Sequence, residues 1–252
     1  MDKDAISKDS ANKGERIAKR MARAGLCSRR DAERWIGEGR VQLNGDVLTT
    51  PATIVTDDDD IVVDGKLLPK KERTRLFLYH KPAGLVTSNK DEQGRTTIFD
   101  KLPKELPRVM TVGRLDINTE GLLLLTNDGE LARHLELPAT GWIRRYRVRS
   151  YGHTSQTQLD KLKKGIVYNK IRYKGINATL EKQQGDNVWV EVALQEGKNR
   201  EVRNVMEAID LKVNRLIRTS YGPFQLGKIE KSAVLEIKQN VLKDQLSGFF
   251  KK

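Results

Sequence analysis

Helical spacing of apolar residues is the first pattern in the chain. Residues 1–13 are polar throughout, which is typical of a disordered tail. After them, Ile17, Met21 and Ala24 recur at the spacing of one helix face, and Gly25 marks the end of that helix. The sequence therefore predicts a short amphipathic helix directly after the tail.

A second helix is predicted a few residues further on. Ser28 and Asp31, three positions apart, have the spacing of a capping box, in which each residue caps the backbone of the other. The helix that follows would bury Ala32, Trp35 and Ile36 on one face.

The period then falls to two, which predicts strands. Apolar and polar residues alternate before Asn44-Gly45, a dipeptide that favours a hairpin turn, and Asp64-Gly65 repeats the signal. Residues 14–70 are thus predicted to form a small αβ domain. The polar and basic residues 71–75 are predicted to be a linker.

Strands dominate from Leu76 onwards. The segments predicted as strands are LFLYH, LVTS, MTVGRL, LLLLT, YRVRSY and VWVEVAL, separated by Gly, Pro, Asn and Asp turns. Helices are predicted at 130–137, 155–164 and 199–209. Because strands and helices do not alternate strictly, we expect residues 76–240 to form an α+β domain with a mainly antiparallel mixed sheet flanked by helices. Residues 241–252 are interpreted as a C-terminal tail.

Charge adds a class of partner to this picture. The chain of 252 residues has 47 Lys and Arg against 34 Asp and Glu, and its net charge of +13 attracts polyanions such as nucleic acid. Cys27 is the one cysteine, which excludes an internal disulfide and fits a reducing compartment. Without a signal-peptide pattern or an apolar run long enough to span a bilayer, we expect a cytoplasmic protein with no membrane partner.

Metal and cofactor chemistry finds little support in the sequence. His80, His134 and His153 are scattered, and one cysteine cannot build a thiolate site. No phosphate-binding glycine motif or zinc-binding motif occurs. The sequence therefore predicts no metal and no nucleotide or redox cofactor.

One segment, VGRLDINTEGLLLLTNDGEL (112–131), places an acidic residue between two apolar strands. We expect the first strand to end at Leu115, a polar loop to open at Asp116, and the second strand to begin at Gly121. An aspartate in this position is usually a turn former, and an Arg-x-Asp neighbour is often a surface pair of low energy. Periodicity alone does not distinguish a catalytic carboxylate from a turn.

Ordered blocks of sequence resemble the RsuA/RluB group of ribosomal RNA pseudouridine synthases. GRLDINTEGLLLLTNDGEL resembles the catalytic motif of that family, RRYRV (144–148) its second motif, and EGKNREVRNVMEAI (196–209) its third. VNRLIRTSYGPFQLG (213–227) follows as in the family, and HKPAGLVTS (80–88) resembles the segment that opens the catalytic domain. The third and fourth of these are most similar to the large-subunit (RluB-type) enzymes.

The N-terminal domain has a resemblance of its own. RIAKRMARAGLCSRRDAERWIGEGRVQLNGDVL (16–48) is similar to the S4 RNA-binding domain. Four arginines could form a basic face for an RNA backbone, although in isolation they would indicate only a solvated helix surface. They are Arg23, Arg29, Arg30 and Arg34.

The resemblance implies isomerisation of uridine to pseudouridine. That reaction breaks the bond from ribose C1′ to N1 and rejoins the same uracil through C5. No atom is gained or lost, which agrees with the absence of cofactor motifs. The target must leave its stack, so the enzyme needs a pocket for a flipped base.

The resemblance also assigns roles to individual residues. Asp116 would either attack C1′ or remove the ribose 2′ proton, and Arg203 would form an ion pair with it that keeps it charged and oriented. Tyr146 would stack on the uracil or help to remove the C5 proton, with an ordinary sheet-core tyrosine as the alternative. Leu216 would pack against the base, or would be an ordinary core leucine.

Weaker candidates for RNA contact lie beside these residues. Arg114 would contact the RNA backbone or brace the Asp116 loop. Lys198 and Arg200 precede a predicted helix, where amides and side chains together suit phosphate. Strand alternation places three arginines on the face opposite Tyr146, namely Arg145, Arg147 and Arg149.

Two other classes of protein remain to be weighed. A non-catalytic RNA-binding or ribosome-assembly protein would share the charge but would have no chemical need for Asp116, Tyr146 and Arg203 together. A metal-dependent nuclease needs a carboxylate cluster, and the dense run Asp57–Asp60 lies far from the catalytic motif. The expected partner is ribosomal RNA, with 23S favoured and 16S possible, free or in an assembling subunit, and the expected state is a monomer.

Overall fold

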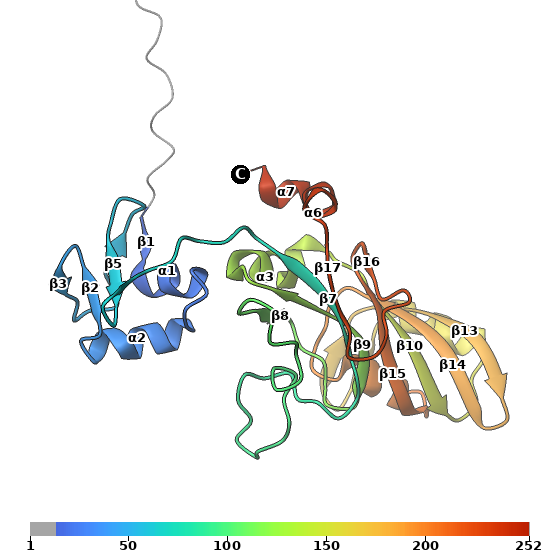
Figure 1. Cartoon of the computed structure of the whole chain (residues 1–252). Helices are drawn as coiled ribbons and strands as arrows, with labels where there is room; N and C mark the ends of the chain where they lie inside the picture. The colour runs from blue at the N-terminus through green and yellow to red at the C-terminus, as the bar shows by residue number, and fades with distance from the viewer. Residues whose placement is uncertain (1–13, 252) are drawn as a thin grey trace, which may run out of the picture. The chain divides into compact units, whose positions relative to one another are not determined.

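Two compact units make up the chain, and they divide between Thr74 and Arg75 (Figure 1). The computed structural model describes residues 14–251, so the tail predicted at 1–13 lies outside the described residues. The predicted linker, residues 71–75, runs without helix or strand to this division. Within the described range, no helix is long and apolar enough to cross a membrane.

The first unit packs two helices against short antiparallel strands. Its helices are α1 (Ile17–Arg23) and α2 (Arg29–Gly37), β1 (Glu15–Arg16) pairs with β4 (Ile54–Val55), and a second sheet has the order β3 (Asp46–Val47), β2 (Val41–Leu43), β5 (Ile61–Val63), β6 (Lys66–Leu67). Both helices and three of the strands contribute to one apolar core. Its members include Ile17, Met21, Ala32, Ile36, Val41, Val55, Ile61 and Val63.

Local signals set the ends of these elements as predicted. The Asp31 amide donates to Ser28 Oγ at 3.0 Å and the Ser28 amide donates to the Asp31 carboxylate at 3.3 Å, so the capping box is confirmed. Asn44 and Asp64 adopt left-handed φ angles of 52° and 50° ahead of their glycines, the conformation that a two-residue hairpin turn requires.

A nine-stranded sheet forms the second unit (Figure 1). Its main order is β13 (Asn177–Gln184), β14 (Asn187–Leu194), β10 (Arg144–Tyr151), β15 (Lys212–Tyr221), β9 (Thr119–Thr126), β7 (Leu76–Lys81), β17 (Val234–Glu236), with β16 (Phe224–Gln225) beside β15 and β8 (Met110–Val112) beside β9. All these pairings are antiparallel except that of β9 with β15. The predicted α+β class with a mainly antiparallel mixed sheet is confirmed.

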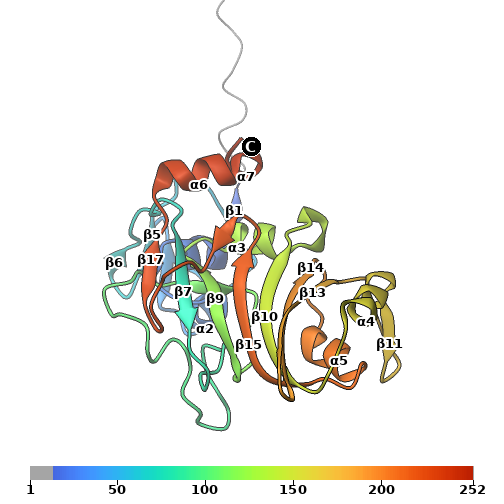
Figure 2. The same ribbon diagram turned by 90° about the vertical axis from the view of Figure 1, so that its right-hand side faces the viewer.

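Each face of this sheet carries its own helical layer. On one face pack α4 (Gln156–Asp160), α5 (Glu201–Glu207), the 3-10 helix η2 (Lys161–Lys164) and the hairpin β11 (Ile166–Tyr168)–β12 (Ile171–Tyr173). Figure 2 shows α4, α5 and β11 together at the same side. On the other face pack α3 (Gly129–Glu136) and the last helices, α6 (Gln239–Gln245) and α7 (Ser247–Phe250); the 3-10 helix η1 (Pro138–Thr140) follows α3.

Three predictions need correction here. The segment LVTS forms no strand, because only Val86 makes a bridge, with Thr97. The strand before Asp116 ends at Val112, where Gly113 turns the chain with a φ of 68°. The residues interpreted as a C-terminal tail form α6 and α7 instead, since Leu242 and Leu246 are buried against the sheet.

Candidate active site

The loop between β8 and β9 holds the predicted catalytic carboxylate. Leu115 is buried, and its carbonyl accepts a hydrogen bond from Thr87 Oγ1 at 2.8 Å. The carbonyl of Asp116 accepts from the Thr119 amide at 2.9 Å, which closes a tight turn. The backbone is therefore fixed on both sides of Asp116, while its side chain keeps 34% of its surface exposed.

A buried lysine holds the backbone of this loop through hydrogen bonds. Lys81, at the end of β7, has no exposed surface, and its ammonium donates to the carbonyls of Pro82, Asp116, Ile117 and Thr119 at 3.0–3.3 Å. Burial lowers the pKa of Lys81 to about 8, and the negative charges of Asp116 and Glu120 oppose that shift. Lys81 thus ties the end of β7 to the backbone that carries Asp116.

The parallel pairing of β9 and β15 places the catalytic motif beside the segment 213–227. Thr119 lies opposite Leu216, and Gly121 lies opposite Arg218. Gly121 has a φ of 104°, and a Cβ at this position would collide with the backbone of Arg218. Only glycine therefore permits β15 to lie this close to the loop that Asp116 opens.

Strand β10 lies on the other side of β15 and presents Tyr146. Tyr146 is 8% exposed and Val148 is fully buried, whereas Arg145, Arg147 and Arg149 are exposed, so the predicted alternation is confirmed. Leu216 is 4% exposed, pairs with Val148, and belongs to the same apolar cluster as Tyr146. The Tyr146 hydroxyl makes no hydrogen bond to any described residue.

The cation paired with Asp116 is not the predicted one. Arg200 Nη1 lies 3.8 Å from Asp116 Oδ2, and no ion pair joins Asp116 to Arg203 among residues 14–251. The terminal nitrogens of Arg203 instead donate to the carbonyls of Asn118 at 3.0 Å and Val213 at 3.3 Å. Arg203 therefore holds the backbone of the loop, and its charge acts on Asp116 over a longer distance.

Arg203 and Arg200 differ in burial. Its side chain is half-buried, burial and the charge of Arg200 lower the pKa of Arg203, and its Nε has no hydrogen-bond partner among the described atoms. Arg200 has a left-handed φ of 51° at the N-cap of α5 and is exposed. Arg200 thus supplies the charge beside Asp116 and Arg203 holds the loop backbone, two roles that were predicted for Arg203 alone.

The start of α5 is not free for phosphate. The amides of Gly197 and Lys198 donate to Glu201 Oε2 at 2.6 and 2.7 Å, so a side chain of the helix itself occupies them. Burial raises the pKa of Glu201. The Lys198 ammonium donates to the Arg172 carbonyl at 2.6 Å and pairs with Glu196 at 3.0 Å, so the amides and the ammonium that were expected to suit phosphate already have partners within the chain.

Arginines around the loop differ in how far they are engaged. Arg114 is exposed, and no hydrogen bond or ion pair holds it to the described part of the chain. Arg147 pairs with Glu181 at 2.7 Å and Arg145 approaches Glu191 at 3.7 Å, so both already have acidic partners.

An acidic residue next to the loop was missed by sequence reasoning. Glu120 is buried and lies between Arg215 at 2.7 Å and Lys231 at 2.8 Å. Its hydrogen bonds with Arg215 and Lys231 lower the pKa of Glu120 to about 2, although burial opposes them.

Lys81 was not predicted as part of the site either. A weak signal for it exists in the sequence, because a lysine at the end of a run of apolar strand residues is unusual.

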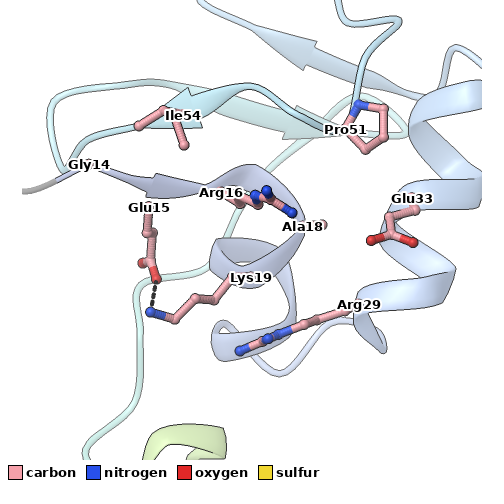
Figure 3. Close-up of a pocket in the computed structure, with 9 residues that line it drawn as sticks. All are labelled: Gly14, Glu15, Arg16, Ala18, Lys19, Arg29, Glu33, Pro51 and Ile54. Atoms are coloured by element: carbon pink, nitrogen blue, oxygen red, sulfur yellow. Dashed lines mark ion pairs between the residues drawn. The ribbon is translucent and has the colours of Figure 1, made fainter.

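The arginines predicted as an RNA face lie in the first unit and have different surroundings. Arg23 donates to Glu15 at 3.1 Å, and Arg34 contacts Asp31 at 3.2 Å. Arg29 and Arg30 are exposed and unpaired within residues 14–251. Figure 3 shows Arg29 with Arg16 at a pocket of about 360 Å³ between α1, α2 and the β1–β4 strands.

The fold and this site define a class of protein. Residues 75–208 match the family model described as RNA pseudouridylate synthase, and residues 15–61 match that of the S4 domain. The chain belongs to the RNA pseudouridylate synthase family, whose members are isomerases that act on uridine in RNA. The resemblance in the sequence and the S4 prediction are thereby confirmed.

Curated relatives and a solved structure agree with this assignment. A protein of Rickettsia felis described as an uncharacterized RNA pseudouridine synthase is 46% identical, covering 90% of this chain and 99% of its own length. The ribosomal large subunit pseudouridine synthase B of Yersinia pestis is 41% identical, covering 85% of this chain and 70% of its own. A crystal structure of a pseudouridylate synthase matches with a TM-score of 0.63 at 25% identity, covering 94% of this chain and 100% of that one.

Proposed function

We propose that this protein converts a uridine of ribosomal RNA, with 23S favoured over 16S, into pseudouridine, and that Asp116 is its catalytic carboxylate. Relatives named ribosomal large subunit pseudouridine synthase B support the choice of RNA. The observation that carries the proposal is the geometry of Asp116. Its backbone is bonded on both sides, its carboxylate is open to a substrate, and Arg200 is its ionic partner at 3.8 Å.

The reaction needs one carboxylate and no added reagent. The bond from C1′ to N1 breaks, the uracil turns within the pocket, and C5 bonds to C1′; C5 then loses its proton and N1 gains one, directly or by way of solvent. Asp116 either attacks C1′ as a nucleophile, in an ester that breaks when C5 bonds to C1′, or removes the ribose 2′ proton and returns it to C2′ in that same step. In both routes the carboxylate acts in its charged form, and the guanidinium of Arg200 supplies the compensating charge.

Arg203 is a positioning residue in this scheme. Its bond to the carbonyl of Asn118 fixes the loop two residues beyond Asp116, and its bond to Val213 fixes the same helix to β15. A rigid loop matters because small displacements of a reacting group cost rate steeply.

In this scheme, Tyr146 and Leu216 form the apolar surface against which the flipped base packs. Both belong to the apolar cluster on the face of the sheet that carries α5, and strand pairing links them through Val148. The Tyr146 ring stacks on the uracil, and its unengaged hydroxyl is available for the C5 proton. All these groups come from one chain, which supports activity as a monomer.

The experiment compares Asp116→Asn with the wild type on 23S rRNA transcribed in vitro, which carries no pseudouridine. Modified positions are read by carbodiimide-dependent primer extension, and RNA binding is measured by filter retention. Asp210→Asn is the matched control, because Asp210 is exposed and its left-handed φ of 62° suits asparagine.

The expected result is one or a few discrete pseudouridines with the wild type and the control, none with Asp116→Asn, and equal RNA binding by all three. A folded wild type that modifies neither 23S nor 16S rRNA, free or in assembling subunits, would refute the proposal. A non-catalytic RNA-binding role would then follow.

A further inference from the structure

An unusually basic segment, made of η2, the β11–β12 hairpin and the residues just after it, lies beside the helix that holds the Asp116 loop. Residues 161–180 contain six Lys and Arg and no Asp or Glu. All six are exposed, and they are Lys161, Lys163, Lys164, Lys170, Arg172 and Lys174. Among the described residues, a single ion pair engages them, that of Lys163 with Asp160 at 2.9 Å.

The hairpin turns one side to the core and the other to solvent. Tyr173 is buried and Ile166 is partly buried in the apolar cluster under the sheet. Because side chains alternate along a strand, Val167 and its cross-strand partner Arg172 point the opposite way. Val167 is 66% exposed, so an aliphatic side chain lies in the open next to a guanidinium.

Helix α5 connects this hairpin to the catalytic loop. On one side, Asn204 Nδ2 donates to the Tyr173 hydroxyl at 2.7 Å, and Lys198 Nζ, from the loop just before the helix, donates to the Arg172 carbonyl at 2.6 Å. On the other side, Arg203 donates to the Asn118 carbonyl at 3.0 Å. A helix with its side chains is about 10–12 Å across, so the hairpin and the Asp116 loop lie on opposite sides of one helix, within reach of neighbouring nucleotides of one RNA strand.

Its charge pattern differs from that of the β13–β14 hairpin at the edge of the nine-stranded sheet. The segment around the β13–β14 turn has Glu181, Asp186 and Glu191 against Lys182. Glu181 and Glu191 pair with arginines of β10, and Asp186 lies 3.1 Å from His153. An ordinary solvated surface has this mixed character. Six cations with only Asp160 and Glu196 beside them in the described part of the chain repel one another, and a polyanion relieves that repulsion.

We propose that the outer face of the β11–β12 hairpin, with Lys170, Arg172 and Lys174, binds the phosphate backbone of the substrate RNA next to the target uridine. Val167 packs against a sugar or base of the same strand. This surface deepens the proposed function and rests on it, because it acts on RNA whose uridine is held at Asp116. It positions the RNA and leaves the chemistry to the site.

The test is a triple variant of the full chain, Lys170→Gln, Arg172→Gln and Lys174→Gln. The control removes the same charge at exposed positions elsewhere in the unit, with Lys182→Gln, Lys238→Gln and Lys243→Gln. The RNA is the 23S transcript, and the readouts are KM, the rate at saturating RNA, and the slope of log Kd against log salt from filter binding.

Three lost phosphate contacts make the salt slope shallower by about 2–3 and raise KM about tenfold or more at 0.15 M salt, since each contact contributes about 0.7–0.9 to the slope. The rate at saturating RNA stays within about twofold of the wild type. A KM and slope equal to those of the control would overturn the inference. So would a fall in saturating rate with an unchanged slope, which would make the hairpin only a support for α5.

Failure of the proposed function gives a different result. If the wild type modifies no uridine in the transcript while its binding slope still depends on the hairpin, the hairpin binds RNA and the substrate assignment is wrong.

Discussion

The four carbonyls around Lys81 permit a prediction about how the loop is held. In Lys81→Met the length and apolar stem remain, but the ammonium that donates to Pro82, Asp116, Ile117 and Thr119 is gone. Two of these carbonyls keep a backbone donor, because the Thr119 amide reaches Asp116 and the Gly84 amide reaches Ile117. The others lose the charged donor, at a cost of about 1.5–3 kcal/mol each.

Removal of the buried charge offsets part of this loss, because its burial was itself unfavourable. We therefore expect the free energy of unfolding to fall by about 2–3 kcal/mol. The Asp116 loop is then free to move, and a displacement of about 1 Å costs about 100-fold in rate. Urea denaturation measures the first effect, and the single-turnover rate on 23S transcript at saturating enzyme measures the second.

The pH profile separates positioning by charge from simple packing. With a pKa of about 8, Lys81 is charged at neutral pH and loses a proton as the pH rises through 8. A neutral amine has two N–H donors for four carbonyls, so the wild-type rate falls in that range. The rate of Lys81→Met should not fall in this alkaline range. The control Lys182→Met, at an exposed position, should keep the wild-type rate and the alkaline fall. Wild-type stability, rate and alkaline fall in Lys81→Met would refute the reasoning.

Three further changes test other parts of the site and fold. Glu120→Gln should lower the free energy of unfolding by about 1–2 kcal/mol at pH 7, a figure reduced because Arg215 and Lys231 are partly exposed. The pKa of Glu120 is lowered from 4.5 to about 2 in the folded protein, so its charge stabilises the fold above pH 4.5. The difference between the variant and the wild type should therefore shrink at pH 3.5. An unchanged difference at both pH values in urea denaturation would contradict this. Tyr146→Phe keeps the ring and should retain most of the binding free energy of the flipped base, whereas Tyr146→Ala should lose about 1–3 kcal/mol of it. The measurements are KM and the single-turnover rate, and equal values for the two variants would argue against stacking. Leu246→Ala should cost about 2–5 kcal/mol in unfolding free energy, and a cost near zero would mean that the C-terminal helices add nothing to the core.

Local signals made the first unit predictable. The capping box of Ser28 and the turns at Asn44 and Asp64 each depend on neighbouring residues, and each formed where the sequence placed it. The same holds for Tyr146, whose inward direction follows from alternation along a single strand. Features that are decided within about five residues can be derived from the sequence.

Features that depend on distant parts of the chain were harder to derive. Arg200 and Arg203 are three positions apart on one segment, and which of them approaches Asp116 depends on how that segment packs against the loop, about 85 positions earlier in the chain. The burial of Lys81 is created by backbone from residues 116–119. The helices after residue 238 depend on two leucines whose partners lie on the sheet, so no periodicity long enough to reveal them exists.

The parallel pairing of β9 with β15 has a consequence for the order of folding during synthesis. Residues 119–121 of β9 cannot pair with their partner strand until residues 216–218, about a hundred positions later, have been synthesised. At ribosomal elongation rates of about 5–20 residues per second, this gap lasts several seconds. The first unit is complete on its own by then, so a nascent chain gains its S4 domain well before it gains a catalytic centre, and a chain broken off between the two keeps the first and never builds the second.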